Sequence, residues 1–187
     1  MRKLKLQMQV SLDGFAAGNN KGVDFKWDSE VRAFSIVNTE GVDRIILGRN
    51  TANGFVPHWA SVAANADDPD HCLGKRLTEI PKIVFSNTVA KSNWPNAEIA
   101  RGETSKEIHR LKKLAGKDML VYGGSSFASF LVKEGLIDQY YLLVNPVAIG
   151  NGVSIFKDLD SNLDLTLLES RNFGCGTVLL IYEAKRR

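Results

Sequence analysis

Residues 118–134 have the residue types of a phosphate-binding turn, because a glycine pair lies between an apolar run and an amphipathic segment. Glycine permits positive φ and a close backbone approach, and Ser125 or Ser126 can cap the helix that follows. The first turn of such a helix presents free N–H groups and the positive end of its dipole to an anion. We therefore predict that this turn binds the pyrophosphate of a dinucleotide, although a glycine pair can also make only a tight turn. The predicted binding residues are Tyr122, Gly123, Gly124, Ser125, Ser126 and Phe127.

Two further apolar runs end in small polar side chains that suit the same ligand. Residues 44–47 and 82–85 are followed by Gly48, Arg49, Asn50 and Thr51 and by Ser86, Asn87 and Thr88, respectively. Ligands of open α/β sheets bind outside the carboxyl ends of the parallel strands, so the three runs predict one shared site. Arg49 together with residues 86–88 would suit a ribose 2′-phosphate, which favours NADPH over NADH. The alternative is that Arg49 only pairs with a carboxylate.

The elements that would position these residues begin with a strand and a helix. Apolar and polar side chains alternate over residues 4–10, as in a strand with one buried face. Asp28 or Ser29 would cap a helix over about 30–38, whose candidate core residues are Val31, Phe34, Ile36 and Val37. The segment 57–79 is polar and irregular, which predicts a lid or an insertion.

Strand and helix alternate about four times before the chain ends in two strands, near 163–173 and 177–184. This alternation predicts a mainly parallel sheet that is covered by helices on both faces. Gly174-Cys175-Gly176 would join the last two strands as an antiparallel hairpin. The fold class is therefore α/β, with a mixed sheet in which the C-terminal hairpin supplies the antiparallel strands.

Length and composition narrow the possible classes of function. The 187 residues suit a single domain over 1–187. A net charge of +3 is too small to argue for a nucleic-acid partner, and the two cysteines and three histidines lack metal-ligand spacing. No apolar run reaches membrane-spanning length, and the first residues lead into a strand rather than a signal peptide. We therefore expect a cytoplasmic protein with reduced thiols and no metal.

Six short blocks occur in the order seen in dihydrofolate reductase-like proteins. They are Ser11-Leu12-Asp13-Gly14-Phe15, Leu47-Gly48-Arg49-Asn50-Thr51, residues 82–88, Tyr122-Gly123-Gly124, Gly135-Leu136-Ile137-Asp138 and residues 146–152. Over nearly its whole length the chain most resembles the C-terminal reductase domain of the bacterial bifunctional riboflavin-biosynthesis deaminase/reductase. The resemblance implies one three-layer α/β/α domain of the dihydrofolate reductase-like fold, with NADPH along the carboxyl edge of the sheet. It also implies a homodimer.

The resemblance further implies roles for individual blocks. Residues 48–51 and 86–88 would hold the adenosine phosphates, residues 123–127 would hold the pyrophosphate, and the loop after the first strand would cover the nicotinamide. Two departures place a phosphorylated ribityl or ribosyl substrate in doubt. Gln7 stands where the riboflavin-pathway reductases usually carry a lysine, and Phe55-Val56-Pro57-His58-Trp59 replaces their Asp-x-Pro-x-Leu segment with its following arginine.

Asp13 or Glu30, or a water held by either, is the candidate source of the proton. Dihydrofolate reductases carry a carboxylate early in the helix after the first loop, and Glu30 fits that place better than Asp28 does. The helix dipole explains an acid at a helix start equally well. Asp13 could face the nicotinamide, or its Asp-Gly pair could form only a turn. The expected apolar walls of a substrate site, each of which could instead be core, are Trp27, Phe55, Trp59 and Phe156.

We therefore expect an NADPH-dependent reductase that transfers hydride to a small heterocyclic or carbonyl/imine substrate. One alternative is the 5-amino-6-(5-phosphoribosylamino)uracil reductase of riboflavin biosynthesis. A second alternative is a non-catalytic NADP-binding regulatory protein that keeps the cofactor edge and has lost the substrate side. In each case the expected partner is a small molecule, and neither a nucleic acid nor a membrane is expected.

Overall fold

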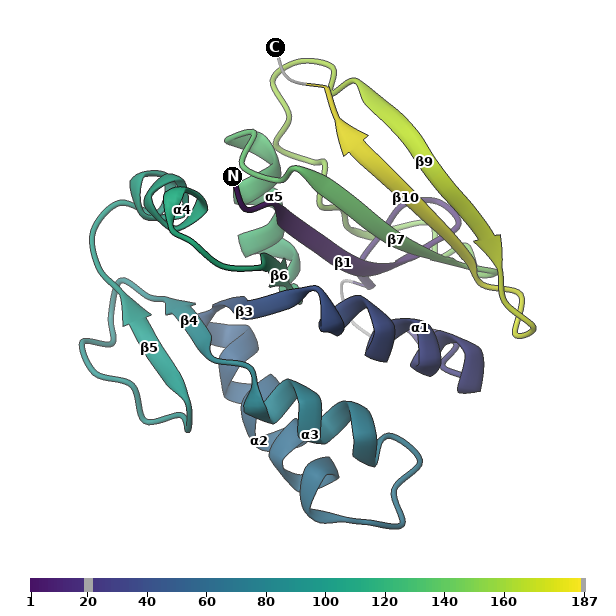
Figure 1. Cartoon of the computed structure of the whole chain (residues 1–187). Coiled ribbons are helices and arrows are strands. Elements are labelled where there is room, and N and C mark those ends of the chain that lie inside the picture. Colours follow the sequence, from purple (N-terminus) through teal and green to yellow (C-terminus); the bar gives the residue numbers. More distant parts are fainter. Residues whose placement is uncertain (19–21, 186–187) are drawn as a thin grey trace.

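The computed structural model describes residues 1–18 and 22–185 as a sheet between two layers of helices (Figure 1). The strands of the main sheet are β1 (Leu4–Ser11), β3 (Val42–Gly48), β4 (Lys82–Phe85), β5 (Ala97–Ala100), β6 (Asp118–Val121), β7 (Gln139–Asn145), β9 (Leu165–Asn172) and β10 (Val178–Ala184). A separate pair is formed by β2 (Ala17–Gly18) and β8 (Gly152–Val153). The helices are α1 (Ser29–Glu40), α2 (Arg49–Ala64), α3 (His71–Glu79), α4 (Thr104–Lys113) and α5 (Ser125–Lys133).

The main sheet has the strand order β5-β4-β3-β6-β1-β7-β10-β9. Its first six strands are parallel, whereas β10 runs antiparallel to both β7 and β9. One face is covered by α1, α2 and α3, and the other by α4 and α5 (Figure 1). The predicted fold class, a mainly parallel sheet with a C-terminal antiparallel hairpin, is confirmed.

The central strand β1 is buried on both faces, so the prediction of a single buried face is wrong. Leu4 and Leu6 point into the core beneath α4 and α5. On the opposite face Gln7 is only 5% exposed. Its side chain donates a hydrogen bond to Ser35 Oγ (3.1 Å) and accepts one from Asn38 Nδ2 (2.7 Å). A polar residue fits here because α1 satisfies both ends of its amide.

Helix α1 begins where the sequence predicted, because Asp28 Oδ1 accepts a hydrogen bond from Val31 N (2.8 Å). Val31 and Phe34 are buried as predicted, and Ile36 is partly buried. Val37 is 61% exposed, so its assignment to the core is wrong. The face of the helix that packs on the sheet has helical three- and four-residue spacing, and the buried residues of the helix are Val31, Phe34, Ser35, Asn38 and Thr39.

Most of the segment 57–79 is helical, so the prediction that it is irregular is wrong, whereas a role as a lid or an insertion is untested. Helix α2 continues through Pro57 to Ala64, and α3 begins at His71. The two helices pack at Gly74, where a Cβ would lie 2.8 Å from Val62 Cγ1. Because Leu73 and Leu77 are buried in the same cluster, tertiary packing holds the proline-containing helix in place.

Lys82 is buried at the start of β4 and is 2% exposed. Its ammonium donates hydrogen bonds to the carbonyl oxygens of Thr78 (2.7 Å) and Ile80 (2.8 Å), which lie at the C-terminal end of α3. No carboxylate is paired with it among the described residues. Burial lowers the pKa of Lys82 to about 8, from its usual 10.5.

The lowered pKa predicts a pH-dependent contribution of Lys82 to stability. Between pH 8 and 10.5 the unfolded chain binds the proton and the folded protein does not, so the free energy of unfolding rises with pH across that window. Relative to Lys82→Met, wild-type protein should gain about 1 kcal/mol between pH 7.5 and about 9.5, after allowance for solvent screening. Urea unfolding at each pH measures this difference. The exposed Lys113→Met is the matched control, and parallel curves for wild type and Lys82→Met would contradict the prediction.

Candidate active site

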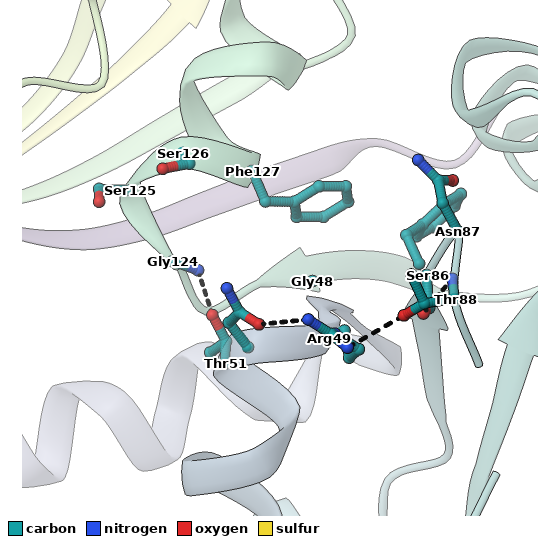
Figure 2. A pocket seen from close by; sticks show the side chains of 12 residues that line it. Gly48, Arg49, Thr51, Ser86, Asn87, Thr88, Gly124, Ser125, Ser126 and Phe127 are labelled. Carbon is teal, nitrogen blue, oxygen red and sulfur yellow. Dashed lines mark hydrogen bonds between the residues drawn. The ribbon is translucent and has the colours of Figure 1, made fainter.

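The carboxyl ends of β4, β3 and β6 open into one cavity of about 510 Å³ (Figure 2). The three strands are neighbours in the sheet, so the structure brings the three predicted strand exits together. The cavity is lined by Gly48, Arg49, Asn50, Thr51, Phe85, Ser86, Asn87, Thr88, Gly124, Ser125, Ser126 and Phe127. Of the residues predicted to bind a cofactor, Tyr122 and Gly123 do not line this cavity.

Two helices point their N-termini into the cavity. The N-cap residues of α2 and α5 are Gly48 and Gly124, so neither helix has a side-chain cap. Neither helix has an acidic residue in its first turn. The prediction that Ser125 or Ser126 caps α5 is therefore wrong, because both lie inside its first turn. The backbone N–H groups of a first turn have no partner within the helix, and the dipole adds positive potential there. The cavity is thus suited to anions.

Close packing of the two helix starts explains both cap glycines. Gly124 N donates a hydrogen bond to Thr51 Oγ1 (2.6 Å), and a Cβ on Gly124 would lie 2.7 Å from that oxygen. A Cβ on Gly48 would lie 3.1 Å from Phe127 Cβ. Gly123 has a φ of +71°, and the peptide bond that joins it to Gly124 is cis. One glycine of the pair therefore permits positive φ, and the other permits the close approach of α2.

Arg49 is exposed and is held by neutral partners. Its guanidinium donates hydrogen bonds to Thr88 Oγ1 (3.0 Å) and Asn50 Oδ1 (3.3 Å) (Figure 2). It forms no ion pair with any described residue, so the alternative in which a carboxylate neutralises it is wrong. The contact with Thr88 links the exit of β3 to that of β4. The guanidinium therefore keeps its full charge for a ligand of the cavity.

Phe85 is a lining residue that the sequence analysis missed. Its ring lies 5.4 Å from that of Phe127, with 30° between the ring planes. The sequence placed Phe85 inside a strand, and nothing in its neighbours marked it as exposed to a ligand. Only the convergence of β4 with α5 brings the two rings together. They form an apolar floor next to the polar strand exits.

Asp13 lies outside the cavity and joins two loops. Its carboxylate accepts hydrogen bonds from Ser11 Oγ (2.5 Å), Ile149 N (3.0 Å) and Gly150 N (2.7 Å). The Ser11 hydrogen bond and these two backbone N–H groups hold the pKa of Asp13 below its usual value. Beyond it, Ala17 of β2 pairs with β8. Asp13 therefore fastens the loop after β1 to the segment after β7, and a role in proton donation stays a prediction.

Glu30 also lies outside the cavity. Its carboxylate accepts a hydrogen bond from Gly174 N in the turn between β9 and β10. Asp28 contacts the same turn, since its Oδ2 accepts a hydrogen bond from Cys175 N (3.2 Å). The hydrogen bond from Val31 N keeps the pKa of Asp28 below its usual value. Both acids thus fasten the start of α1 to the hairpin, and the predicted proton transfer by Glu30 is untested.

Three of the four predicted substrate-wall residues, Trp27, Phe55 and Trp59, belong to an aromatic group that packs against one buried cluster on the α2 side of the sheet. Phe55 lies 6.1 Å from Trp59 and 5.5 Å from Tyr122, measured between ring centroids. Trp27 packs against the same cluster, and its Nε1 donates a hydrogen bond to Asp70 (3.0 Å). All four rings are half-buried.

Phe156 does not join this aromatic group. It packs beside Tyr140, with the ring centroids 6.1 Å apart, in the cluster under α5 on the opposite face of the sheet. Its predicted place in a wall of the substrate site is untested.

Two negative observations apply to residues 1–18 and 22–185. No group of three or more His, Cys, Asp or Glu side chains there could ligate a metal ion. No helix in these ranges combines the length and the apolar character that are needed to cross a membrane.

The chain is similar to two proteins of Bacillus subtilis (strain 168) and to a described family. The uncharacterized protein YyaP is 30% identical over 184 residues, which covers 97% of this chain and 94% of YyaP. The uncharacterized protein YwjB is 29% identical over 175 residues, which covers 92% of this chain and 93% of YwjB. The model of the RibD C-terminal domain matches residues 2–179.

Solved structures share the fold at low sequence identity. A Shewanella sp. PV-4 protein whose name links it to riboflavin biosynthesis superposes with a TM-score of 0.74 at 23% identity, covering 98% of this chain and 99% of its own. The diaminohydroxyphosphoribosylaminopyrimidine deaminase/5-amino-6-(5-phosphoribosylamino)uracil reductase of Thermotoga maritima superposes with a TM-score of 0.71 at 19% sequence identity. The match covers 98% of this chain and 57% of the Thermotoga maritima chain. A pyrimidine reductase-like protein of Corynebacterium diphtheriae superposes with a TM-score of 0.63 at 14% sequence identity. The match covers 100% of this chain and 93% of the Corynebacterium diphtheriae chain. With the family model matching nearly its whole length, the chain belongs to the RibD C-terminal domain family.

Proposed function

We propose that the chain is an NADPH-dependent reductase that transfers hydride to a small heterocyclic or carbonyl/imine substrate. One observation carries the proposal. Two helix N-termini without side-chain caps and the unneutralised guanidinium of Arg49 meet in one cavity at the carboxyl edge of the sheet. Membership of a family that is named for a riboflavin-pathway domain supports a reductase role.

The first turn of α5 is the proposed binding site of the pyrophosphate. Its unpartnered backbone N–H groups and the hydroxyls of Ser125 and Ser126 are hydrogen-bond donors that suit phosphate oxygens. The cavity fits such a group because glycine at Gly48 and Gly124 lets the two helix starts approach closely. When bound, NADPH would supply the hydride, and the chain would supply binding and orientation.

The charge of the cavity favours NADPH over NADH. Among the described residues that line the cavity, Arg49 carries a positive charge and none carries a carboxylate. NADH sites of open α/β proteins commonly present a carboxylate to the ribose hydroxyls, whereas a guanidinium suits the 2′-phosphate of NADPH. Thr88 and Asn50 hold the guanidinium without neutralising it, so its remaining donors can bind that phosphate.

The carboxylates outside the cavity would act by holding loops. Asp13 has a lowered pKa, so at neutral pH it is ionised and has no proton to donate. We therefore assign Asp13 to positioning of the loop after β1, and the proton of the reaction would come from Glu30 or from a water. The aromatic group of Trp27, Phe55, Trp59 and Tyr122 would form the apolar wall for a flat substrate.

The uracil reductase of riboflavin biosynthesis is the second candidate, since the Thermotoga maritima protein with the same fold carries that activity in its name. The side chain at Gln7 weakens this candidate, because it is buried and bonded to Ser35 and Asn38 and supplies no positive charge to a substrate phosphate. Rapid NADPH oxidation with 5-amino-6-(5-phosphoribosylamino)uracil would support it, and its absence with NADPH-binding protein would remove it.

Fluorescence titration with NADPH tests the proposed function itself. The account expects saturable binding with a dissociation constant in the micromolar range or below, on the order of typical cofactor affinities. A folded protein that binds neither NADPH nor NADP⁺ would contradict the reductase proposal and would also exclude the regulatory alternative.

Arg49→Ala should weaken NADPH binding by about 1–3 kcal/mol and NADH binding much less, because it removes charge-assisted hydrogen bonds to the 2′-phosphate. Parallel titrations with both cofactors measure the difference. Arg49→Lys, which keeps the charge but loses the planar fork, should fall between wild type and Arg49→Ala. Arg101→Ala removes an exposed arginine outside the cavity and serves as the control. Equal losses of binding affinity for NADPH and NADH would show that Arg49 does not bind the 2′-phosphate.

Gly124→Ala should lower NADPH affinity at least about tenfold, because the new Cβ would displace Thr51 Oγ1 and disturb the start of α5. Gly54→Ala is the matched control: it lies exposed in α2 with no atom within 4 Å of its added Cβ, so it should leave binding unchanged. Its stability should rise by about 0.5–1 kcal/mol. Undiminished NADPH binding by folded Gly124→Ala would exclude the start of α5 as the phosphate seat.

A further inference from the structure

Strand β9 forms one edge of the main sheet, and no other strand of the described residues pairs with its outer side (Figure 1). The free N–H and C=O groups of an edge can pair with another chain, so proteins commonly keep edge strands short or place lysine or proline on them. The opposite edge strand, β5, has only 4 residues. Strand β9 has 8 residues and contains neither lysine nor proline. It is therefore the edge to which a further strand can be added.

The outward hydrogen-bonding groups of β9 belong to Ser170 and Asn172. Phe173 N donates a hydrogen bond to Thr177 O (2.9 Å), so the backbone groups of Phe173 point toward β10. Along an antiparallel pair these groups point alternately toward the neighbouring strand and away from it. The residues two and four positions before Phe173 therefore also point toward β10, whereas Ser170 and Asn172 point their N–H and C=O groups outward. Both of these residues are exposed.

The β-bulge of β9 leaves this stretch regular. The register shift lies between Ile181 and Tyr182 of β10, where Leu168 is the extra residue of β9. From Glu169 to Asn172 each residue has one partner on β10. A bulge can protect an edge by twisting it away from other strands. Here the bulge precedes the exposed stretch, so residues 169–172 keep the geometry that pairing with another strand needs.

The side chains of this stretch are complementary to a second copy of themselves. Glu169 and Arg171 lie on the face of β9 that borders α1, and both line a groove of about 590 Å³ beside that helix. In an antiparallel pair of two β9 strands with their Ser170 residues opposite each other, Glu169 of each copy faces Arg171 of the other. Both would be non-hydrogen-bonded pairs, in which cross-strand side chains lie closest together.

Neighbouring registers lack this complementarity. Pairing centred on Glu169 would bring two carboxylates directly opposite each other, and pairing centred on Arg171 would bring two guanidinium groups together. Like charges in that position are destabilising, whereas opposite charges are stabilising. The side chains of Glu169 and Arg171 are 42% and 52% exposed, so a second copy can reach both. The charges of β9 thus favour a single register, which is centred on Ser170.

We propose that β9 is the interface of a homodimer, in which two β9 strands pair antiparallel about Ser170 and join the two sheets into one. The two Ser170 residues exchange backbone hydrogen bonds, and a Glu169–Arg171 pair flanks them on each side. Leu167 and Leu168, which are 51% and 50% exposed, are partly covered by the second copy. Because the same surface is used by both copies, the contact closes with two chains. The inference goes beyond the proposed reductase function and does not rest on it.

Sedimentation equilibrium of the full-length protein over a range of concentrations tests the contact. Wild type should sediment with the mass of two chains, with a dissociation constant in the micromolar range or below. Ser170→Pro removes the outward N–H group but no hydrogen bond to β10, so the variant should fold and should dimerise at least about thirtyfold more weakly. Circular dichroism checks that its secondary structure is unchanged.

Charge reversal tests the register. Glu169→Arg and Arg171→Glu each bring like charges opposite each other, so either variant alone should dimerise about tenfold or more weakly than wild type. An equimolar mixture of the two variants should dimerise again, because every cross-strand pair then has opposite charges. The double variant Glu169→Arg/Arg171→Glu should dimerise by itself for the same reason. Glu103→Arg is the control, since it makes the same change of charge at an exposed residue before α4 and should leave the dimer unchanged.

Three results would overturn the inference. The first is a wild-type protein that stays monomeric at every concentration. The second is a dimer that folded Ser170→Pro or the charge-reversed single variants form as tightly as wild type, which would place the interface elsewhere. The third is weak dimerisation of the single variants that neither mixing nor the double variant restores, which would exclude the register centred on Ser170.

Discussion

The close approach of the starts of α2 and α5 is the constraint on which the rest of the site depends. Both helices begin at glycine, and the Thr51–Gly124 hydrogen bond joins them where β3 and β6 end. This packing leaves no room for a Cβ on Gly124. The parallel order β4-β3-β6 makes the approach possible, because it brings three strand exits to the same edge of the sheet.

The N-termini of two helices and the Arg49 guanidinium all place positive potential in a single cavity. Like-signed groups repel each other, and no carboxylate lines the cavity to compensate within the described residues. An anionic ligand with several phosphate oxygens would relieve that repulsion and would satisfy the free N–H groups. The acids near the site serve a different purpose, since Asp13, Asp28 and Glu30 each hold one loop against another.

The sequence predicted the order of strands and helices and the three strand exits because these depend on local patterns of apolar, glycine and small polar residues. It failed where tertiary packing decides. Pro57 lies within α2, which α3 packs against at Gly74, and Gln7 is buried because α1 bonds its amide. Ser125 lies inside α5 because its cap is Gly124. The contact of Phe85 with Phe127 joins distant segments, so no local pattern could indicate it.

A crystal structure of the protein with NADP⁺ tests the central claim most directly. The account predicts pyrophosphate oxygens within hydrogen-bonding distance of the backbone N–H groups of Ser126 and Phe127, with the 2′-phosphate on the Arg49 guanidinium. The nicotinamide should then lie on the Tyr122 side of the cavity. NADP⁺ bound elsewhere, or in this cavity with its phosphates away from the start of α5, would contradict the account.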